Sequence, residues 1–514
     1  MKQLPKISAL SIFGLYFSCT LIAAEIQVKA ISGSPLREAI TAAKSGDTLV
    51  LQPGLFYENV RVEKALTIRG RPGVIVDGST PLKAEWSPVE NMKGVFASPA
   101  EKRPFGLLVA GKFIAEIRFD RAQKSGEWFW ETLLAKGTPL SGFDQVRALW
   151  IYHPKEKRIY VRLEKGESPA TLDVSAVMSE KPLVEIAASG VVVDGVTFAA
   201  GVVAVKLTDG AKDCVIRGCR VTSYEGGGIV IKGGASSCTV EDCEITRGAL
   251  EEWKPTEVNR RENYEIWRLH KEVGKYDRIG IELNQAGVGN RILRNHIDRV
   301  FDGICVGDYR AESLDKPLPD PNHGRGTEIA QNVIENTRDS GIELGVGCID
   351  VNVHHNTLRS THGGFRFKLP RIGPVFIHHN RLINGTPFHF WFSMDSSPAE
   401  GYVYHNTMTG GGDAALVYSS FNANRSFATP NWHFLNNLAL GVKDGFFGQR
   451  KNTPARDFKE SNNITSDDAN AAVDAGLDLS TFLKGKLLPG CEPGYFKGAA
   501  PDAGADESAR SLRK

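Results

Sequence analysis

Apolar and polar residues alternate along the second half of the chain in a pattern that returns at a near-constant interval. Within residues 215–440 each copy reads apolar-x-apolar-x-x-Asn-x-apolar, then a polar turn, then Gly-apolar-x-apolar. Short runs of period-two alternation, rich in Val, Ile and Phe and broken by Gly and Asn, indicate β-strands rather than helices. The central position of the copies is occupied by Cys219, Cys243, Asn295, Asn332, Asn356, Asn380, Asn406 and Asn437.

The interval between copies predicts the fold. Successive central positions lie 24, 52, 37, 24, 24, 26 and 31 residues apart, so the unit has 24 residues and some copies carry insertions. A unit of that length makes one coil of short strands and cannot bury its own apolar face, so coils must stack. We expect an all-β protein: a right-handed parallel β-helix, which is a solenoid, with an N-terminal capping helix and an inserted antiparallel β subdomain.

The central asparagines are expected to be structural. Identical amides in successive coils can hydrogen-bond to one another along the stack, as amide ladders do in cross-β structures. Cys219 and Cys243 occupy the same position, and Cys214 and Cys238 form a second pair with the same spacing. Each pair is expected to be adjacent along the stack, either as a disulfide or as two buried thiols.

The repeat and its interruptions divide the chain into segments. Ser34 and Pro35 suit the start of a helix over 36–43, which would cap the first coil. A tryptophan-rich stretch without the repeat predicts the inserted subdomain, and the first long insertion has the pattern of an amphipathic helix over 257–273. The expected segments are 1–24, a signal peptide; 25–80, the cap and first coils; 81–180, the inserted subdomain; 181–449, the main β-helix with loop insertions at 248–277 and 308–326; and 450–514, an irregular C-terminal cap.

The N-terminus indicates export. Lys2 and Lys6 precede an apolar run over 9–24, which is short for a membrane span and is typical of a signal peptide cleaved near Ala23 or Ala24. We therefore expect a periplasmic or extracellular protein without a membrane span. A membrane anchor is the alternative interpretation of the same run.

Composition narrows the partners. The formal net charge is +2, which gives no bulk electrostatic reason to bind nucleic acid. The chain has 8 cysteines, one of them in the signal segment, too few for a dense disulfide framework. We expect a monomer whose partner is a polysaccharide.

Stacking the Gly-apolar-x-apolar strands places charged residues in one outward column. The column reads Val230, Glu282, Cys305, Glu343, Arg366 and His389, and the column two residues further reads Lys232, Asn284, Gly307, Gly345, Lys368 and Trp391. Such a mixture of acids, bases and an aromatic ring on one face favours a catalytic site. The alternative is a ladder of surface ion pairs, which adds little stability.

The spacing of the acids favours hydrolysis. Glu282 and Glu343 are two coils apart, which is about 9–10 Å at the spacing of parallel strands. That lies at the upper end of the roughly 6.5–9.5 Å between the acid and base of inverting glycosidases. Asp302 and Asp308 border the strand between them, although Asp302, like Asp339, could equally serve an Asx-turn.

The remaining candidates are basic, amide and aromatic residues. Arg366 follows Glu343 by one coil and would hold it ionised. We take Glu282, Asp302, Asp308, Glu343, Arg366 and His389 as candidate catalytic residues, and Lys368, His362, Trp391, Tyr418, Arg310 and Asn284 as candidate substrate-binding residues. No cofactor is required by these residues, no metal motif stands out, and a calcium ion held by carboxylates stays open.

Several motifs resemble a known superfamily. Residues 339–343 (DSGIE), 352–356 (NVHHN), 373–377 (GPVFI) and 404–407 (YHNT) resemble the secreted right-handed β-helix proteins grouped with pectate lyases and glycoside hydrolases. The resemblance implies a glycan substrate and either hydrolase or lyase chemistry. Glu343 and Arg366 fall where alginate-lyase-like enzymes carry a similar pair, but the position of their catalytic lysine is near Gly347 and Cys348, which cannot serve.

The expected function is therefore cleavage of a polysaccharide, with an anionic glycan favoured, by hydrolysis through an acidic pair. The first alternative is a lyase acting by β-elimination on a uronate-containing glycan. The second alternative is a non-catalytic glycan-binding surface protein.

Overall fold

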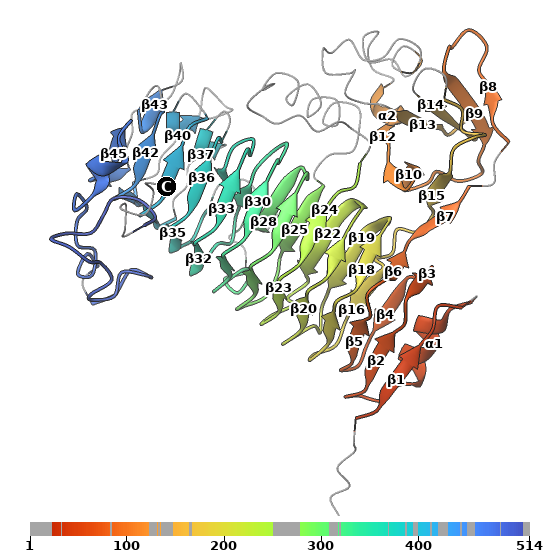
Figure 1. Ribbon diagram of the computed structural model, residues 1–514, viewed down its shortest axis with the longest axis horizontal. Coiled ribbons are helices and arrows are strands. Elements are labelled where there is room, and N and C mark those ends of the chain that lie inside the picture. The colour runs from red at the N-terminus through yellow and green to blue at the C-terminus, as the bar shows by residue number, and fades with distance from the viewer. Residues whose placement is uncertain are drawn as a thin grey trace, which may run out of the picture.

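The computed structural model shows one elongated stack of coils with a smaller subdomain beside its first coils (Figure 1). It describes residues 23–506 except 32, 83–84, 123–130, 132–133, 135–147, 164–166, 250–277, 308–316, 318–319, 369, 386–387, 394–398, 412–413, 420–429, 443–444, 450–457 and 484. The signal segment up to residue 22 and the helix expected over 257–273 lie outside the described residues. No helix within the described ranges is long and apolar enough to cross a membrane.

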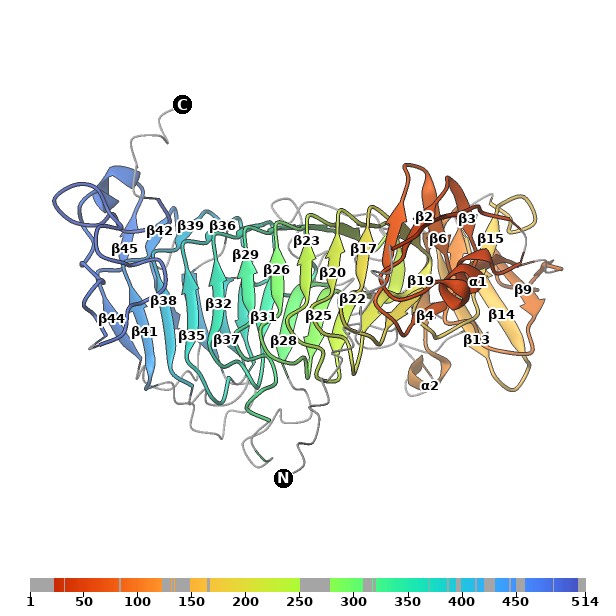
Figure 2. The same ribbon diagram turned by 90° about the horizontal axis from the view of Figure 1, so that it is seen from below.

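Each coil contributes one strand to each of three parallel sheets, which Figure 2 shows as rows running along the long axis. Within the described residues, sheet 1 has 13 strands, sheet 2 has 12 and sheet 3 has 11. The repeat therefore encodes three strands per coil, and the predicted parallel β-helix is confirmed.

The strands of sheet 1, in order, are β1 (Glu25–Val28), β2 (Thr48–Leu51), β5 (Thr67–Gly70), β17 (Val192–Asp194), β20 (Val215–Arg217), β23 (Thr239–Glu241), β26 (Arg291–Leu293), β29 (Glu328–Ala330), β32 (Val351–His354), β35 (Val375–His378), β38 (Gly401–Tyr404), β41 (Trp432–Leu435) and β44 (Lys459–Ser461).

Those of sheet 2 are β3 (Gly54–Phe56), β6 (Val74–Asp77), β18 (Thr197–Ala199), β21 (Arg220–Val221), β24 (Glu244–Thr246), β27 (His296–Asp298), β30 (Val333–Glu335), β33 (Thr357–Arg359), β36 (Arg381–Ile383), β39 (Thr407–Thr409), β42 (Leu438–Leu440) and β45 (Ile464–Ser466).

Those of sheet 3 are β4 (Val60–Val62), β16 (Val184–Ile186), β19 (Gly201–Leu207), β22 (Tyr224–Lys232), β25 (Ile279–Asn284), β28 (Asp302–Gly307), β31 (Ile342–Leu344), β34 (Phe365–Phe367), β37 (Phe388–Ser393), β40 (Ala414–Ser419) and β43 (Phe447–Gln449).

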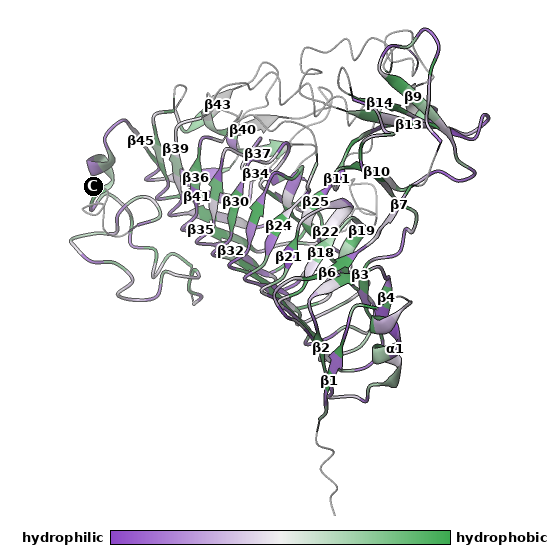
Figure 3. Cartoon of the chain, turned by 45° about the vertical axis from the view of Figure 1, so that its right-hand side comes forward, coloured by the Kyte–Doolittle hydropathy of each residue, from purple (hydrophilic) through white to green (hydrophobic). Residues whose placement is uncertain are grey.

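Alternation along the strands sends every second side chain into the solenoid, and Figure 3 shows hydrophobic and hydrophilic positions alternating accordingly. One continuous apolar core runs from Val28 in the first coil to Phe458 near the last. Towards the C-terminus aromatic rings fill it, and Phe367 stacks on Phe392 with ring centroids 4.4 Å apart. Burial of this stripe is what makes a short repeat stable only in a stack.

The asparagine ladder forms at the corner between sheets 1 and 2, as predicted. Each buried amide Nδ2 donates to the Oδ1 of the next coil over 2.8–3.0 Å, from Asn295 to Asn437, and the ladder continues to Asn463. The residue before each ladder asparagine has a left-handed φ, for example 55° at His355. The left-handed residue makes a tight corner there, and the amide that follows it is buried.

The cysteines in the ladder position are buried and free. Cys243 donates its backbone N–H to Asn295 Oδ1 over 3.0 Å, so Cys219 and Cys243 continue the column without an amide. All seven cysteines of the described residues are free thiols, which settles the two open pairs in favour of packing.

The capping helix is α1 (Pro35–Ala42), with Leu36 and Ile40 buried against the first coil. Ser34 stands at the N-cap, but its side chain makes no cap hydrogen bond. The carboxylate of Glu58 instead accepts the N–H groups of Leu36 and Arg37, both over 2.9 Å. A carboxylate at this end also complements the helix dipole, so a residue 22 positions away replaces the local cap.

The inserted subdomain leaves the solenoid after β6 and contains two small sheets. Their strands pair antiparallel except for β12 with β13. One sheet holds β7 (Ser79–Pro81), β10 (Gly106–Val109), β11 (Lys112–Phe113) and β15 (Val174–Val177), and the other holds β8 (Ser87–Pro88), β9 (Val95–Pro99), β12 (Ala115–Ile117), β13 (Leu149–His153) and β14 (Arg158–Arg162), with α2 (Phe119–Ala122) beside them.

The solenoid continues beyond residue 449. Strands β44 and β45 add to sheets 1 and 2, and the short 3-10 helix η3 (Ala469–Ala472) follows. Ala472 and Ala503 pack on Leu438, so the tail covers the last coils.

Candidate active site

The outward column of sheet 3 has the predicted register over five coils. Val230 pairs with Glu282, Glu282 with Cys305, Cys305 with Glu343, and Glu343 with Arg366. These backbone pairings place the two glutamates on one stripe, two strands apart. Their side chains come from β25 and β31, and Cys305 of β28 lies between them.

The next member of the column is Trp391, so the expected place of His389 was wrong. Arg366 pairs with Trp391, which moves Trp391 out of the neighbouring column and into this one. Phe388, Phe390 and Phe392 alternate so regularly that a shift of two residues still leaves two phenylalanines in the core, here Phe390 and Phe392. Alternation fixes which face a residue is on but cannot detect a two-residue slip.

His389 is fully buried rather than presented on the face. Its Nε2 lies 2.8 Å from the backbone oxygen of Gly410, and burial lowers the pKa of the ring to about 4. A neutral imidazole held by a backbone carbonyl is not placed to touch a substrate.

Glu343 lies among cations. Lys368 Nζ is 2.9 Å from its Oε1, Arg366 Nη1 is 3.8 Å from its Oε2, and Ser340 Oγ donates to Oε2 over 3.5 Å. Burial by itself would lower the pKa of Lys368, but the facing Glu343 outweighs it and the pKa is raised. The pair is therefore an ion pair, with Lys368, whose side chain is 21% exposed, lying over the buried carboxylate.

Arg366 links the column to its neighbours. Its Nη1 donates to Asp339 Oδ1 over 3.2 Å. Its guanidinium carbon lies 4.5 Å from the centre of the Trp391 ring, a cation–π contact. Trp391 is half-buried, so one ring shields the arginine while remaining partly open to solvent.

Glu282 has the opposite environment. It is half-buried, and burial raises the pKa of its carboxyl despite a 3.0 Å hydrogen bond from Asn284 Nδ2. One glutamate of the column is therefore biased towards the protonated form, while the other lies in an ion pair. A carboxyl group that holds its proton more readily suits a general acid, and a carboxylate held in an ion pair suits a general base.

The two aspartates have structural partners. Asp302 Oδ1 accepts the backbone N–H of Ser340 in the next coil over 2.9 Å. Asp339 carries the ion pair with Arg366. Both are buried, and both tie adjacent coils together.

The other candidates either lie away from the two glutamates or fall outside the described residues. Asp308 and Arg310 lie outside the described residues. The backbone of Tyr418 is in register with the inward Phe392, and its side chain is among those the structure does not describe. His362 is half-buried in the coil of Arg366 and donates its backbone N–H to Thr337 over 3.3 Å.

A buried ionic cluster was missed by the sequence analysis. Arg278 Nη2 lies 2.6 Å from Glu225 Oε1, Arg247 Nη2 lies 3.7 Å from Glu225 Oε2, and all three side chains are at most 3% exposed. Both arginines also face the ring of Phe301. The signal was present: Glu225, Arg278, Asp302 and Arg338 each stand one to three residues before the glycine of the repeated Gly-apolar-x-apolar motif.

Metal binding has little support in these side chains. Across the described residues no group of three or more His, Cys, Asp or Glu is arranged to hold a metal ion. The carboxylates of Glu343 and Asp339 already face arginine or lysine, which is the wrong neighbourhood for calcium.

Several solved structures are similar to this chain. The xylose complex of XylC is 15% identical, with 86% of this chain and 75% of that one covered and a TM-score of 0.46. The catalytic domain of a GH87 α-1,3-glucanase in complex with nigerose is 11% identical, with coverages of 85% and 68% and a TM-score of 0.47. The polygalacturonase from Erwinia carotovora ssp. carotovora is 10% identical, with coverages of 85% and 96% and a TM-score of 0.43.

Residues 183–368, which contain most of the outward column, match the family model described as the right handed beta helix region. The three parallel sheets show that the fold is a right-handed parallel β-helix, and the matched residues lie within it. No curated protein matches the chain.

Proposed function

We propose that the protein is an exported enzyme that hydrolyses a polysaccharide bearing anionic groups, with Glu282 as general acid and Glu343 as general base. The observation that carries the proposal is the contrast between the two glutamates: burial raises the pKa of Glu282, whereas Glu343 is ion-paired with Lys368. A proton donor and a carboxylate on one stripe match the division of labour in inverting glycosidases.

The separation of the pair supports inversion. Two strand spacings amount to about 9–10 Å, which leaves room for a water molecule between Glu343 and the sugar. Asp302 is a weaker partner for this chemistry because its Oδ1 accepts a backbone N–H of the next coil.

Lys368 covers Glu343, the proposed base, and could be drawn away from it by an anionic group of the substrate. Its ammonium lies over Glu343 and is itself partly exposed. A carboxylate or sulfate on the substrate would attract the ammonium away from Glu343 and open that carboxylate to water. Trp391, held against Arg366, offers an aromatic face to the sugar ring.

The runner-up, β-elimination by a lyase, needs a base that loses its proton near neutral pH. The raised pKa of Lys368 makes it a poor base, and His389 is enclosed by protein. Glu282 and Glu343 are therefore better suited to acid–base catalysis than Lys368 and His389 are.

The test is a panel of plant and algal polysaccharides incubated with the purified mature protein. We expect new reducing ends without ultraviolet absorbance from an unsaturated uronate. Glu282→Gln and Glu343→Gln should each lower kcat by about 10²–10⁴-fold while retaining the circular dichroism spectrum. The matched control is Glu244→Gln, an exposed glutamate paired with Arg220 on sheet 2, which should leave kcat unchanged.

Two results would replace the proposal. Absorbance from an unsaturated product would make the protein a lyase. Glycan binding without turnover, unchanged in both variants, would make it a binding protein. Export is tested separately by sequencing the N-terminus of the protein recovered outside the cytoplasm, which is expected near Glu25. Light scattering tests the monomeric state.

A further inference from the structure

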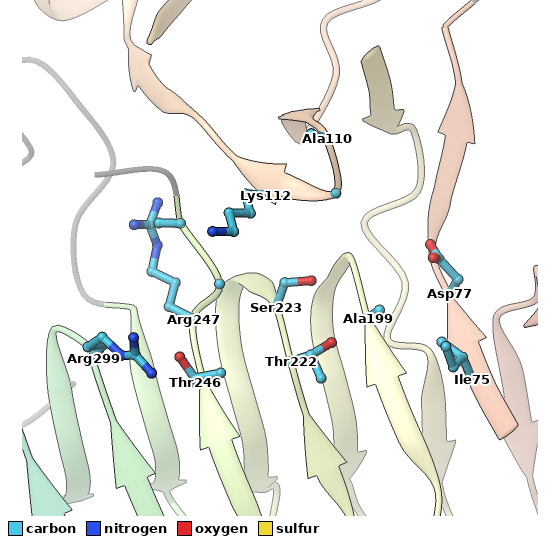
Figure 4. A pocket seen from close by; sticks show the side chains of 13 residues that line it. Ile75, Asp77, Ala110, Lys112, Ala199, Thr222, Ser223, Thr246, Arg247 and Arg299 are labelled. Carbon is cyan, nitrogen blue, oxygen red and sulfur yellow. The ribbon is translucent and has the colours of Figure 1, made fainter. Parts of the chain in front are cut away.

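A pocket lies away from the outward column, at the corner between sheets 2 and 3. Its roof is the turn between β10 and β11 of the inserted subdomain, and its floor is formed by the ends of β6, β18 and β24 and by the turn after β21 (Figure 4). Its volume is about 490 Å³. That is within the roughly 300–1,000 Å³ of pockets that enclose small molecules.

The roof is held firmly over the solenoid. Phe113 of β11 is fully buried, donates its backbone N–H to Gly248 over 3.0 Å and bridges to Ala249. Gly248 has a φ of +60°, and a Cβ there would come within 2.2 Å of the backbone oxygen of Thr222. The segment that receives the roof therefore depends on a glycine to pass close to the preceding coil, and the backbone contacts of Phe113 make the pocket a formed feature of the fold.

The walls of the pocket differ in charge. Lys112, Arg247 and Arg299 lie on one side, and Figure 4 shows Lys112 extending towards Arg247. Arg247 is held by Glu225 and Arg299 by Asp298, whereas Lys112 makes no ion pair with any residue that the structure describes. Cationic groups that converge on one space favour an anion in it.

The opposite wall and the floor carry neutral or acidic oxygen atoms. Asp77 lies on the far side, where burial raises the pKa of its carboxyl and Ser79 donates a backbone N–H to it over 2.7 Å. Thr222, Ser223 and Thr246 line the floor with hydroxyl groups. A ligand that fits both halves has an anionic group at one end and hydroxyls at the other.

We propose that this pocket binds one acidic sugar unit, with its carboxylate or sulfate beside Lys112 and Arg299 and its hydroxyls towards Asp77 and the threonines. The site belongs to the junction between subdomain and solenoid and takes part in no bond cleavage. It goes beyond the proposed hydrolysis, because binding here requires neither Glu282 nor Glu343.

Titration calorimetry of the full mature protein tests the proposal with four probes: methyl glucuronoside, glucose 6-sulfate, methyl glucoside and inorganic sulfate. We expect one or both acidic sugars to bind at least about tenfold more tightly than the neutral sugar and than sulfate alone, the gain of a charge-assisted hydrogen bond. Whichever acidic sugar binds identifies the source of the anion.

Variants locate the binding. Lys112→Gln should weaken the acidic sugar by about tenfold, since it removes the cation without a described ion-pair partner. The matched control is Lys155→Gln, an exposed lysine in another turn of the same subdomain, which should bind as the unmodified protein does. Glu343→Gln should also bind normally, so that failure of the proposed hydrolysis leaves this result intact.

The proposal is overturned by equal binding of neutral and acidic sugars, by unchanged binding in Lys112→Gln, or by no binding of any acidic probe. Inorganic sulfate binding as tightly as the sugar sulfate would also overturn it, because the pocket would then recognise an anion and not a sugar.

Discussion

Two columns of the solenoid use the same stacking register in opposite ways. At the corner between sheets 1 and 2 one residue type repeats from coil to coil, and each amide both donates to and accepts from its neighbours. A group that is donor and acceptor at once can repeat without limit. The ladder is therefore uniform, buried and neutral, and it serves the scaffold.

The outward column of sheet 3 cannot be uniform, because stacked like charges repel. Its members change from Glu282 to Cys305, Glu343, Arg366 and Trp391, and Glu343 is balanced by Arg366 and Lys368 of the next coil. Repetition in a solenoid thus indicates structure, and departure from repetition indicates chemistry. The predictions below challenge that contrast.

The largest expected effect concerns the buried charges at the start of sheet 3. Arg278→Met removes the arginine that lies 2.6 Å from Glu225 and leaves this buried carboxylate 3.7 Å from Arg247. Loss of one member of a buried pair costs about 3–5 kcal/mol of unfolding free energy. Urea unfolding followed by circular dichroism measures it.

The double variant Arg278→Met/Glu225→Gln should recover much of that loss, because it removes the buried negative charge as well. Arg291→Met, which breaks an exposed pair with Glu328 on sheet 1, should cost about 0–1 kcal/mol. A loss in Arg278→Met no greater than in this control would contradict the importance of the buried cluster.

The second effect concerns the ladder. Asn356→Ala removes an amide that accepts the backbone N–H of Asn332 and donates to Asn380 and to the Ile329 carbonyl, each over 2.9 Å. Buried groups left without partners should lower the unfolding free energy by about 2–3 kcal/mol. The same urea experiment applies, with the exposed Asn470→Ala as control.

Activity separates the two columns further. Asn356→Ala should retain the kcat of the unmodified protein at a temperature where it is folded, whereas Glu343→Gln should lose kcat while remaining stable. If the ladder variant were fully folded and inactive, the division between scaffold and site would be wrong.

Features that follow from the repeat could be predicted from the sequence, whereas features that occur once could not. The 24-residue interval predicted the coils, the amide ladder and the column as far as Arg366, because each follows from one register. The place of His389 failed because three alternating phenylalanines accept a two-residue shift. The pocket under Lys112 depends on how the inserted subdomain folds back onto the solenoid, which no local pattern encodes.

Low pH should destabilise the folded protein through the histidines at the ladder corner. His378, His379 and His405 lie beside the ladder, and His379 stacks on His405. Burial, and then the charge of neighbouring imidazoles, lowers the pKa of His378 well below its usual value. The same two causes lower the pKa of His379 to about 3. Burial lowers the pKa of His405 to about 4. The folded protein keeps these rings neutral where the unfolded chain takes up protons.

Stability from the neutral rings is present above the unfolded pKa of 6.5 and is lost as the pH falls through that value towards the folded pKa values. Each ring should cost about 1 kcal/mol between about pH 6.5 and 5.5. His379→Gln should remove one such contribution from the pH dependence of urea unfolding, whereas Asn470→Ala, which changes no titratable group, should not. Identical pH profiles for both variants would exclude protonation at this corner.

The smallest effect, none, is expected from a reducing agent. The ladder position of the early coils holds Cys219 and Cys243, whose strands pair in register. A hydrogen bond to Cys219 and burial raise the pKa of Cys243 well above its usual value, which keeps it a thiol. Because all seven described cysteines are free, dithiothreitol should leave the unfolding free energy unchanged, and all seven should react with a thiol reagent after denaturation without reduction. A bridge across a coil would instead contribute about 2–4 kcal/mol, lost on reduction. Such a loss would mean that a covalent bond replaces the amide ladder in these coils.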